Sequence, residues 1–446
     1  MQKKVASARG LRGVIRVPGD KSISHRALML AALAEGTTEI EGFLASADCL
    51  HTEKCLSSLG ISIKRESALT SMPLPAKAQR GEEKIYVEGQ GLGGLQEPQE
   101  ILDVGNSGTT MRLLSGILAG QSFASFLTGD LSLRKRPMER VVIPLQKMGA
   151  RIIGRQGGTL APLAITGGNL QPITYQMSVA SAQVKSALLL AGLFTPGWTE
   201  VLEPTISRNH TELMLEAFGA QVERGESRVR VKGLSELTAQ KVVVPGDLSS
   251  AAFLLVAGLV VPDSRVIIKS VGLNPTRSGI IDVLKAMGAK LRISEEQEIA
   301  GELRGTIEVE SSSLAGVSIG GEIVPRLIDE LPILAVAGLF ARGITEIRDA
   351  GELKVKESNR LTAICEGLTR LGGRVEELPD GLRIQGGASL RGAFCRSFGD
   401  HRIAMALAIA ALGAEGETVI DDAEAVEVSF PGFWSLLDEL RSENRC

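Results

Sequence analysis

One pattern recurs six times along this 446-residue chain: an extended entry, a polar turn and then a short apolar helix. Each copy continues into a β-rich segment such as "GITEIRDA" and a second, amphipathic helix, and most of these second helices end near a glycine. The polar turns with their apolar helices lie at 17–36, 102–120, 177–194, 242–260, 322–340 and 397–413. Repetition on this scale restricts the fold to an α/β architecture built from β-α-β-α-β-β units.

The six units divide most simply into two domains of three. The motif "VPGD" occurs at 17–20 and again at 244–247, which marks equivalent starts. We therefore expect one domain over 17–240 and a second, discontinuous domain over 1–16 and 241–446. A hydrophobic content of 44% in a chain of this length can supply two cores. The first helix of each unit is apolar all round and should be buried, whereas the second should lie at the surface.

The expected arrangement of the core helices favours anions. If the three core helices of a domain run parallel, their N-terminal ends converge, and each carries the positive end of a helix dipole. Two domains facing each other would direct six such ends into one cleft. This arrangement concentrates positive potential without a net positive charge, and the formal charge of the chain is −3.

Composition argues against several classes of protein. The balance of 49 basic and 52 acidic residues disfavours nucleic-acid binding, and an aromatic content of 3% leaves few side chains to stack on bases. The cysteines (Cys49, Cys55, Cys365, Cys395 and Cys446) and the four histidines show no metal or redox spacing, so we expect neither metal nor cofactor. Since the sequence has no secretory signal and no apolar run long enough for a membrane, we expect a cytoplasmic protein.

The polar turns place cations where helix electrostatics usually favours acids. Lys21, Ser22 and Arg26 open the first helix; capping by Asp20 or Ser22 explains this one turn about as well as a bound anion does. Because at least four units repeat the arrangement, an anion site is favoured. Asp329 is an acid where neighbouring units supply cations or amides, and a lone carboxylate among bound anions is a candidate general base. The polar turns of the other units contain Asn106, Gly108, Thr109, Ser181, Gln183, Lys185, Asp400, His401 and Arg402.

Several long motifs resemble the 5-enolpyruvylshikimate-3-phosphate (EPSP) synthase family over essentially the whole chain. They are "GDKSISHRALMLAALA", "GNSGTTMRLL", "LTGDLSLRKRPM", "SAQVKSALLLAG", "VKESNRL" and "GDHRIAMALA", while "DKS", "SAQVK", "RNHTE" and "NPTR" resemble its class II branch. The resemblance implies a two-domain, inside-out α/β barrel of six β-α-β-α-β-β repeats, three per domain, with two chain crossings and the active site in the cleft between domains. It also implies transfer of the enolpyruvyl group of phosphoenolpyruvate to the 5-hydroxyl of shikimate 3-phosphate, with release of phosphate, in aromatic amino-acid biosynthesis.

The resemblance also assigns residues to these two small-molecule substrates. Asp329 would accept the 5-hydroxyl proton, and Glu357 with Lys21 would handle the C3 proton. Phosphoenolpyruvate would contact Lys21, Gly108, Arg136, Gln183, Arg360 and Arg402. Shikimate 3-phosphate would contact Lys21, Ser22, Arg26, Ser181, Ala182, Gln183, Arg208, Asp329 and Lys356. Nothing in the sequence requires more than a monomer.

Three details stay open at this point. Val428 stands before "SFP", where many family members carry lysine, so a phosphate contact is either absent or supplied elsewhere. Both Arg134 and Arg136 could be the phosphate ligand, and we favour Arg136 from its place before Pro137. Gly108 favours sensitivity to the family's inhibitor glyphosate, whereas the class II resemblance points the other way.

Two other functions are also compatible with the repeats. An enolpyruvyl transferase acting on a UDP-sugar shares the architecture, but it usually carries a catalytic cysteine in a loop that corresponds to 129–140, and this stretch contains none. A non-catalytic anion-binding scaffold would need neither Asp329 nor Glu357.

Overall fold

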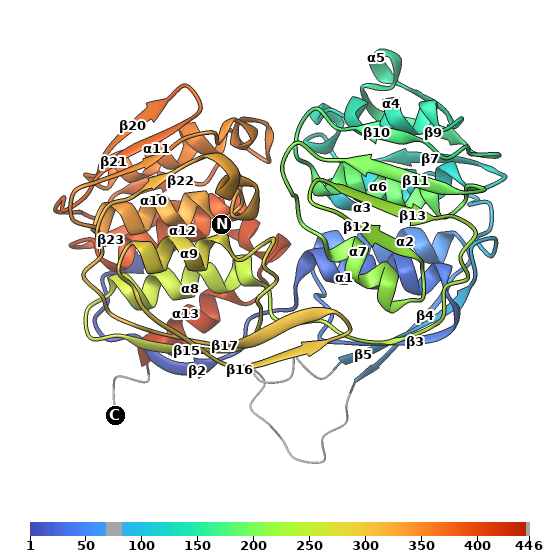
Figure 1. Ribbon diagram of the computed structural model, residues 1–446. Coiled ribbons are helices and arrows are strands. Elements are labelled where there is room, and N and C mark those ends of the chain that lie inside the picture. The colour runs from blue at the N-terminus through green and yellow to red at the C-terminus, as the bar shows by residue number, and fades with distance from the viewer. Residues whose placement is uncertain (68–82, 443–446) are drawn as a thin grey trace. The chain divides into compact units, whose positions relative to one another are not determined.

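The computed structural model describes residues 1–67 and 83–442, and the chain divides into two compact units (Figure 1). Unit 1 comprises Met1–Pro18, Gly246–Gln297 and the chain from Leu303 onward, and unit 2 comprises Gly19–Pro245 with Glu298–Glu302. The division expected from the sequence differs at three places: it placed 17–18 with the first three repeats, and 241–245 and 298–302 with the last three. Cys446, one of the cysteines that show no metal or redox spacing in the sequence, lies outside the described residues.

Unit 2 contains, over its described residues, three four-stranded sheets that correspond to the first three repeats. Its elements in chain order are α1 (Lys21–Leu33), β3 (Glu35–Glu41), α2 (Ala47–Ser58), β4 (Ser62–Ser67), β5 (Glu83–Gln90), β6 (Leu102–Asp103), α3 (Gly108–Ala119), β7 (Ala124–Thr128), η2 (Leu133–Lys135), α4 (Glu139–Lys147), β8 (Arg151–Gly154), α5 (Arg155–Gly158), β9 (Leu160–Thr166), β10 (Thr174–Gln176), α6 (Ala182–Gly192), β11 (Trp198–Leu202), α7 (His210–Ala217), β12 (Val222–Arg224), β13 (Arg228–Lys232) and β14 (Lys241–Val243).

The three sheets of unit 2 share one topology. Their strand orders are β14-β3-β5-β4, β6-β7-β9-β8 and β10-β11-β13-β12, and in each the first pair is parallel while the others are antiparallel. In the second and third sheets the core helix connects the parallel pair. In the first sheet, the strand parallel to β3 is β14, with Val242 opposite Ile40. Because β14 completes this sheet, unit 2 extends to Pro245.

Unit 1 contains, in the part of the chain described, two four-stranded sheets and one three-stranded sheet. Its elements in chain order are β1 (Lys3–Ala6), β2 (Arg12–Ile15), α8 (Leu248–Val260), β15 (Arg265–Gly272), α9 (Gly279–Ala286), β16 (Lys290–Ile299), β17 (Glu302–Glu310), β18 (Ser318–Ile319), η3 (Gly321–Arg326), α10 (Leu331–Phe340), β19 (Ile344–Ile347), η4 (Gly351–Val355), α11 (Arg360–Arg370), β20 (Arg374–Leu378), β21 (Gly381–Gln385), β22 (Phe394–Arg396), α12 (His401–Leu412), β23 (Glu417–Asp421), η5 (Ala423–Val428) and α13 (Phe433–Ser442).

The strands that precede α1 and α8 are exchanged between the sheets of the first and fourth repeats. β2 precedes α1 in the chain but pairs in parallel with β15, as β14 precedes α8 but pairs with β3. The sixth repeat departs from the expected pattern, because β23 is followed by η5 and α13 rather than by two strands after a helix. The antiparallel neighbour of β23 is instead β1, with Lys3 opposite Ile420.

The first helix of each repeat forms the core, as the sequence predicts. Every residue of α12 is buried, as are 248–259 of α8 and 331–339 of α10, and these three helices pack on one another in unit 1. In unit 2, α3 packs against α6 and α1 (Figure 1). The second helices alternate buried and exposed residues, as in α11, because one face of each meets solvent.

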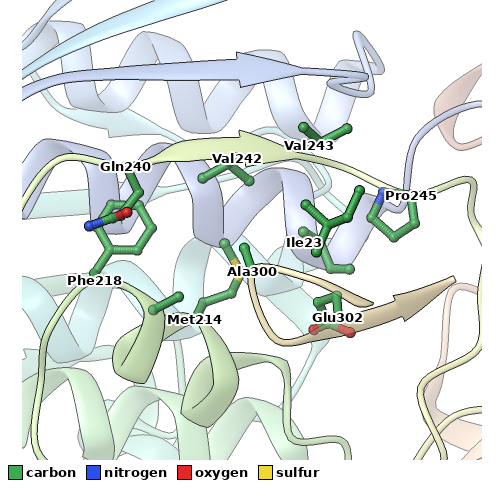
Figure 2. A pocket seen from close by; sticks show the side chains of 11 residues that line it. Ile23, Met214, Phe218, Gln240, Val242, Val243, Pro245, Ala300 and Glu302 are labelled. Carbon is green, nitrogen blue, oxygen red and sulfur yellow. The ribbon is translucent and has the colours of Figure 1, made fainter. Parts of the chain in front are cut away.

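The turn between β16 and β17 belongs to unit 2. Ile299, Ala300 and Glu302 line a small pocket with residues of α1 and α7, including Ile23 and Met214 (Figure 2). Figure 2 shows Ala300 beside Met214, and it shows Glu302 on the side of the pocket where Ile23 and Pro245 lie. The turn therefore covers apolar surface of α1 and α7.

Candidate active site

Polar side chains join the N-terminal parts of the core helices in unit 2. His25 Nδ1 on α1 lies 2.7 Å from Thr52 Oγ1 on α2, and that hydroxyl lies 2.6 Å from Thr110 Oγ1 on α3. On α6, Gln183 Nε2 donates to Thr109 Oγ1 at 3.0 Å. The predicted convergence of helix N-termini is thus confirmed within this unit.

Two acids act at the start of α1, where one caps the helix and the other pairs with Lys21. The Asp20 carboxylate caps the helix by accepting from the Ile23 N–H at 2.9 Å. The Lys21 ammonium lies 3.1 Å from Asp48 Oδ2 on α2. The helix start therefore has both a cap and a cation. The Asp48 carboxylate offsets the unfavourable interaction of the Lys21 cation with the positive end of the helix dipole. Sequence reasoning missed Asp48, since nothing in "ASADCL" marks a partner that lies 27 positions from Lys21.

Arg26 is buried and points its guanidinium at three different elements. Nε donates to Thr211 Oγ1 at 2.6 Å, Nη2 donates to Ser186 Oγ at 2.8 Å, and Nη1 donates to the Ser22 carbonyl at 2.9 Å. Burial lowers the pKa of Arg26 to about 10, although Glu212 and Asp20 oppose the shift. The side chain therefore remains a cation at neutral pH.

Gly108 and Gln183 lie together with an arginine that the sequence analysis did not single out. Arg112 Nη1 donates to Gln183 Oε1 at 2.8 Å, and Arg112 Nη2 donates to the Pro137 carbonyl at 3.1 Å. The amide of Gln183 is thus oriented from both ends, since Thr109 accepts from its Nε2. The single charged residue in "GTTMRLLSG" was the signal available in the sequence.

Of the two arginines left open by the sequence, Arg136 lies beside the start of α3. Arg136 Nη2 donates to Asn106 Oδ1 at 2.6 Å and Nη1 donates to the Asn106 carbonyl at 3.4 Å. Arg134 Nε donates instead to the Asp130 carbonyl of its own segment at 3.3 Å. The geometry supports Arg136 as the arginine nearer to Gly108.

The remaining predicted residues of unit 2 lie on or next to helix starts. Ser181 is the N-cap of α6, and its side chain accepts from the Val184 N–H at 3.4 Å. Ala182 is the first residue of α6, Ser22 lies in the first turn of α1, and Arg208 precedes α7.

His25 is a second buried titratable group on α1, beside Arg26. Burial lowers the pKa of His25 to about 3, and Lys21 and Arg26 act in the same direction. The imidazole is therefore neutral in the folded protein at any pH near neutrality. Asp48, whose charge favours the imidazolium, is outweighed.

We expect His25 to make folding stability pH-dependent. Below about pH 6.5 the unfolded chain binds a proton at His25 that the folded protein does not, so stability should fall as pH falls, by up to about 1.4 kcal/mol per pH unit. Urea unfolding at a series of pH values measures this, and His25→Gln should flatten the slope. His51→Gln, at a histidine nearer the surface, is the matched control. Equal slopes in wild type and His25→Gln would contradict the assignment.

Unit 1 holds a second group, centred on Arg360 at the start of α11. The Arg360 side chain is 2% exposed and meets three carboxylates: Asp400 Oδ2 at 2.8 Å, Glu357 Oε2 at 2.6 Å and Asp329 Oδ1 at 3.4 Å. Burial disfavours the charge of Arg360, but Asp400, Glu357 and Asp329 outweigh it and raise its pKa above the ordinary value. For Asp400, burial opposes ionisation and Arg360 outweighs it, so the pKa of Asp400 is lowered.

Asp329 lies among cations from three parts of the chain. Its carboxylate is 3.4 Å from Arg360, 3.7 Å from Lys356 and 3.9 Å from Arg402, and its carbonyl accepts from Arg402 Nη1 at 3.1 Å. The expectation that it is a lone carboxylate is wrong, because Glu357 and Asp400 share Arg360 with it. The acids are needed to balance a guanidinium that is buried.

Helix starts converge in this unit too. Ser249, near the start of α8, donates to the side chain of Glu330, which is the N-cap of α10. Arg402, at the start of α12, lies 3.9 Å from the same Glu330 carboxylate. Arg277 Nη2 donates to Ser249 Oγ at 2.8 Å and to Asp247 Oδ1, the α8 cap, at 2.7 Å. The predicted convergence is thus confirmed in unit 1 as well.

Two further properties concern the whole of the described chain. Over residues 1–67 and 83–442, no three His, Cys, Asp or Glu side chains are gathered in a way that could hold a metal ion. Within the same residues, no helix has the length and apolar character required to cross a membrane.

Comparison with known proteins identifies the family. The family model for EPSP synthase (3-phosphoshikimate 1-carboxyvinyltransferase) matches residues 5–437. A 3-phosphoshikimate 1-carboxyvinyltransferase of Desulforamulus reducens is 54% identical over 440 residues, which is 99% of each chain. The chain belongs to the EPSP synthase family. A relative with the same name from Bacillus thuringiensis subsp. konkukian is 54% identical over 431 residues, 97% of each chain.

Solved structures of EPSP synthases share the fold. The EPSP synthase of Acinetobacter baumannii matches with a TM-score of 0.86 at 40% identity, over 99% of this chain and 98% of the other. The enolpyruvyl transferase NikO of Streptomyces tendae matches with a TM-score of 0.78 at 18% identity, over 98% and 96% of the two chains, which indicates a shared fold only. The family resemblance and the two-domain α/β fold predicted from the sequence are confirmed, and the UDP-sugar alternative is not supported.

Proposed function

We propose that this chain transfers the enolpyruvyl group of phosphoenolpyruvate to the 5-hydroxyl of shikimate 3-phosphate and releases phosphate. Its EPSP synthase relatives carry the corresponding name. The observation that carries the proposal is Asp329, an acid in contact with Lys356, Arg360 and Arg402 beside the second acid Glu357. Such a group can bind anions and still exchange protons.

The two groups of residues described above would act on one pair of substrates. Both substrates carry a phosphate and a carboxylate, so each needs several cations. Arg360, Arg402, Lys21 and Arg136 are proposed to hold phosphoenolpyruvate, with Gly108 and Gln183. Ser22, Arg26, Ser181, Ala182, Gln183, Arg208 and Lys356 are proposed to hold shikimate 3-phosphate. Fixed cations of this kind stabilise the negative charge that the reaction redistributes.

The chemistry proceeds by addition and then elimination. Asp329 takes the 5-hydroxyl proton as the oxygen bonds to C2 of phosphoenolpyruvate, while Glu357, with Lys21, supplies a proton to the C3 methylene. The elimination step removes a proton from the resulting methyl group and breaks the bond from C2 to the phosphate oxygen. The atoms balance without electron transfer, so the reaction as written uses no cofactor.

Phosphate release tests the proposal. A coupled assay should detect phosphate only when both phosphoenolpyruvate and shikimate 3-phosphate are present. Binding of both substrates without release would support the non-catalytic scaffold instead. Val428, which ends η5, supplies no cation, so its change to lysine should leave the reaction in place if other residues already hold the phosphate.

We also propose that the reaction takes place in the cytoplasm. Cys49, Cys55, Cys365 and Cys395 are free thiols in the structure, as expected in a reducing compartment. A monomer stays a prediction, and light scattering of the purified protein measures it.

Gly108 leads to a prediction about inhibition. It is the first residue of α3, and a Cβ there would lie 2.8 Å from Arg112 Nη1 and 3.4 Å from Arg136 Nη1. Gly108→Ala should therefore displace the Arg112 guanidinium, which orients the Gln183 amide, and raise the KM for phosphoenolpyruvate. Glyphosate is longer than phosphoenolpyruvate, so its inhibition constant should rise by a larger factor, since one buried methyl misfit costs about 1–3 kcal/mol.

Inhibition and KM series on both proteins measure this difference. Gly93→Ala is the matched control, because its Cβ would meet nothing within 4 Å. Equal factors for the two ligands would show that the alanine disturbs only the protein.

A further inference from the structure

Lys185 is a buried cation to which the proposed reaction gives no role. Its side chain is 1% exposed in the first turn of α6. The ammonium lies 2.8 Å from Glu203 Oε2 and 2.7 Å from Glu212 Oε1, and it donates to the Ser207 carbonyl at 3.1 Å. Since an ammonium has three N–H donors, these contacts use all of them. Lys185 therefore acts on the protein rather than on a substrate.

The contacts of Lys185 fix Ser207 from several directions. Glu203, just after β11, accepts from the Ser207 N–H at 3.1 Å and from the Ser207 hydroxyl. The Ser207 carbonyl accepts from Lys185. Both backbone groups of Ser207 and its side chain are thus bonded to one buried ion pair. The next residue in the chain is Arg208.

The chain is also fixed on the other side of Arg208. His210, the first residue of α7, places Nδ1 2.7 Å from Glu302 Oε1, and both side chains are buried. Glu302 is one of the residues that line the pocket in Figure 2. Arg208 therefore has an anchored residue directly before it and another two positions after it.

The ion cluster also adjoins Arg26. Arg26 donates to Ser186 and Thr211, which are the chain neighbours of Lys185 and Glu212. Glu212 stabilises the charged form of Arg26, whereas Arg208 opposes it, which indicates that the two guanidinium groups are within electrostatic range. One cation and two carboxylates leave a net negative charge beside two arginines. The cluster thus allows two like charges to occupy one region.

We propose that Lys185 is a positioning residue for Arg208. Through Glu203 and Ser207 it fixes the backbone from which the Arg208 guanidinium reaches the anion. The inference rests on the proposed function, in which Arg208 binds shikimate 3-phosphate.

A double-mutant cycle tests the inference. Lys185→Met and Arg208→Ala are made singly and together, and shikimate 3-phosphate binding is measured by calorimetry alongside kcat and KM. We expect each single change to weaken binding by about tenfold, comparable to losing one charge-assisted contact, with kcat affected less. The double variant should bind no more weakly than Arg208→Ala, because Lys185 acts through Arg208.

Further variants keep the test decisive. Ser207→Ala removes only the hydroxyl contact to Glu203, and it should show a smaller effect with the same non-additivity even where Lys185→Met fails to fold. Arg65→Met breaks partly buried ion pairs with Glu53 and Glu83 in the same unit, and it should lower stability without changing binding.

Two outcomes would overturn the inference. The first is that Lys185→Met weakens shikimate 3-phosphate binding by the same factor in the Arg208→Ala variant as in the wild type. The second is that Lys185→Met leaves this binding unchanged although Arg208→Ala weakens it. Unchanged binding in Arg208→Ala would instead refute the role of Arg208 and the inference with it. Absence of turnover in the wild type, with the binding cycle intact, would refute the proposed reaction alone.

Discussion

Replacing Asp329 by asparagine is expected to lower kcat by about 10²–10⁴-fold, the usual contribution of general-base catalysis. The amide keeps an oxygen that can accept from Arg360, but it cannot take the 5-hydroxyl proton. Lys356, Arg360 and Arg402 lose a neighbouring negative charge. Their attraction for anionic substrates should therefore not weaken, and the KM for shikimate 3-phosphate should change little.

Steady-state kinetics separate the two parameters. Asp282→Asn is the matched control, since Asp282 pairs with Arg326 at the surface and should leave kcat unaltered. Near-normal turnover in Asp329→Asn would remove Asp329 from the role of base. A large rise in KM with unchanged kcat would make it a binding residue.

Replacing Arg360 by methionine is expected to have the largest effect on folding. The change leaves Asp400, Glu357 and Asp329 without the guanidinium that they share, and Asp400 is fully buried. Loss of one partner from a buried ion pair typically costs about 3–5 kcal/mol. Guanidinium chloride unfolding at pH 7 measures this loss, and phosphate release should fall with it.

The pH dependence distinguishes this cause from lost packing. In the wild type the lowered pKa of Asp400 gives stability that is present at neutral pH and is lost as pH falls through its range. Without Arg360, burial should raise the pKa of Asp400, so the destabilisation should shrink as pH falls. Arg326→Met, at a surface pair worth about 0–1 kcal/mol, is the control. A destabilisation that is constant with pH would indicate a packing defect.

Much of the fold was predictable because it depends on local periodicity. The apolar helices at 17–36 and 397–413 are buried as the sequence indicates, since apolar residues on every face leave no surface for solvent. The exchange of β2 and β14 was only partly predictable. Parallel pairing of Val242 with Ile40 joins residues some 200 positions apart, and no local pattern specifies such a partner.

The candidate site also contains residues that the sequence indicates and residues that it does not. Lys21 stands out in the sequence because a charge at the start of an apolar helix requires explanation. Arg360 was found through the family motif "VKESNRL", since it begins the amphipathic helix α11. Asp48 and Arg112 do not stand out, because each matters through one distant side chain, Lys21 or Gln183, that only the fold brings near.

The exchanged strands also determine the order in which the chain can complete itself during synthesis. Unit 2 has all its strands once β14 has left the ribosome, so most of it can fold while the second half is still being made. β1 and β2 pair with β23 and β15, so they are synthesised well before the strands that they join. A rearranged gene that moves 1–18 behind the last helix would reverse that order, and β1 and β2 would then emerge after their partners had been made.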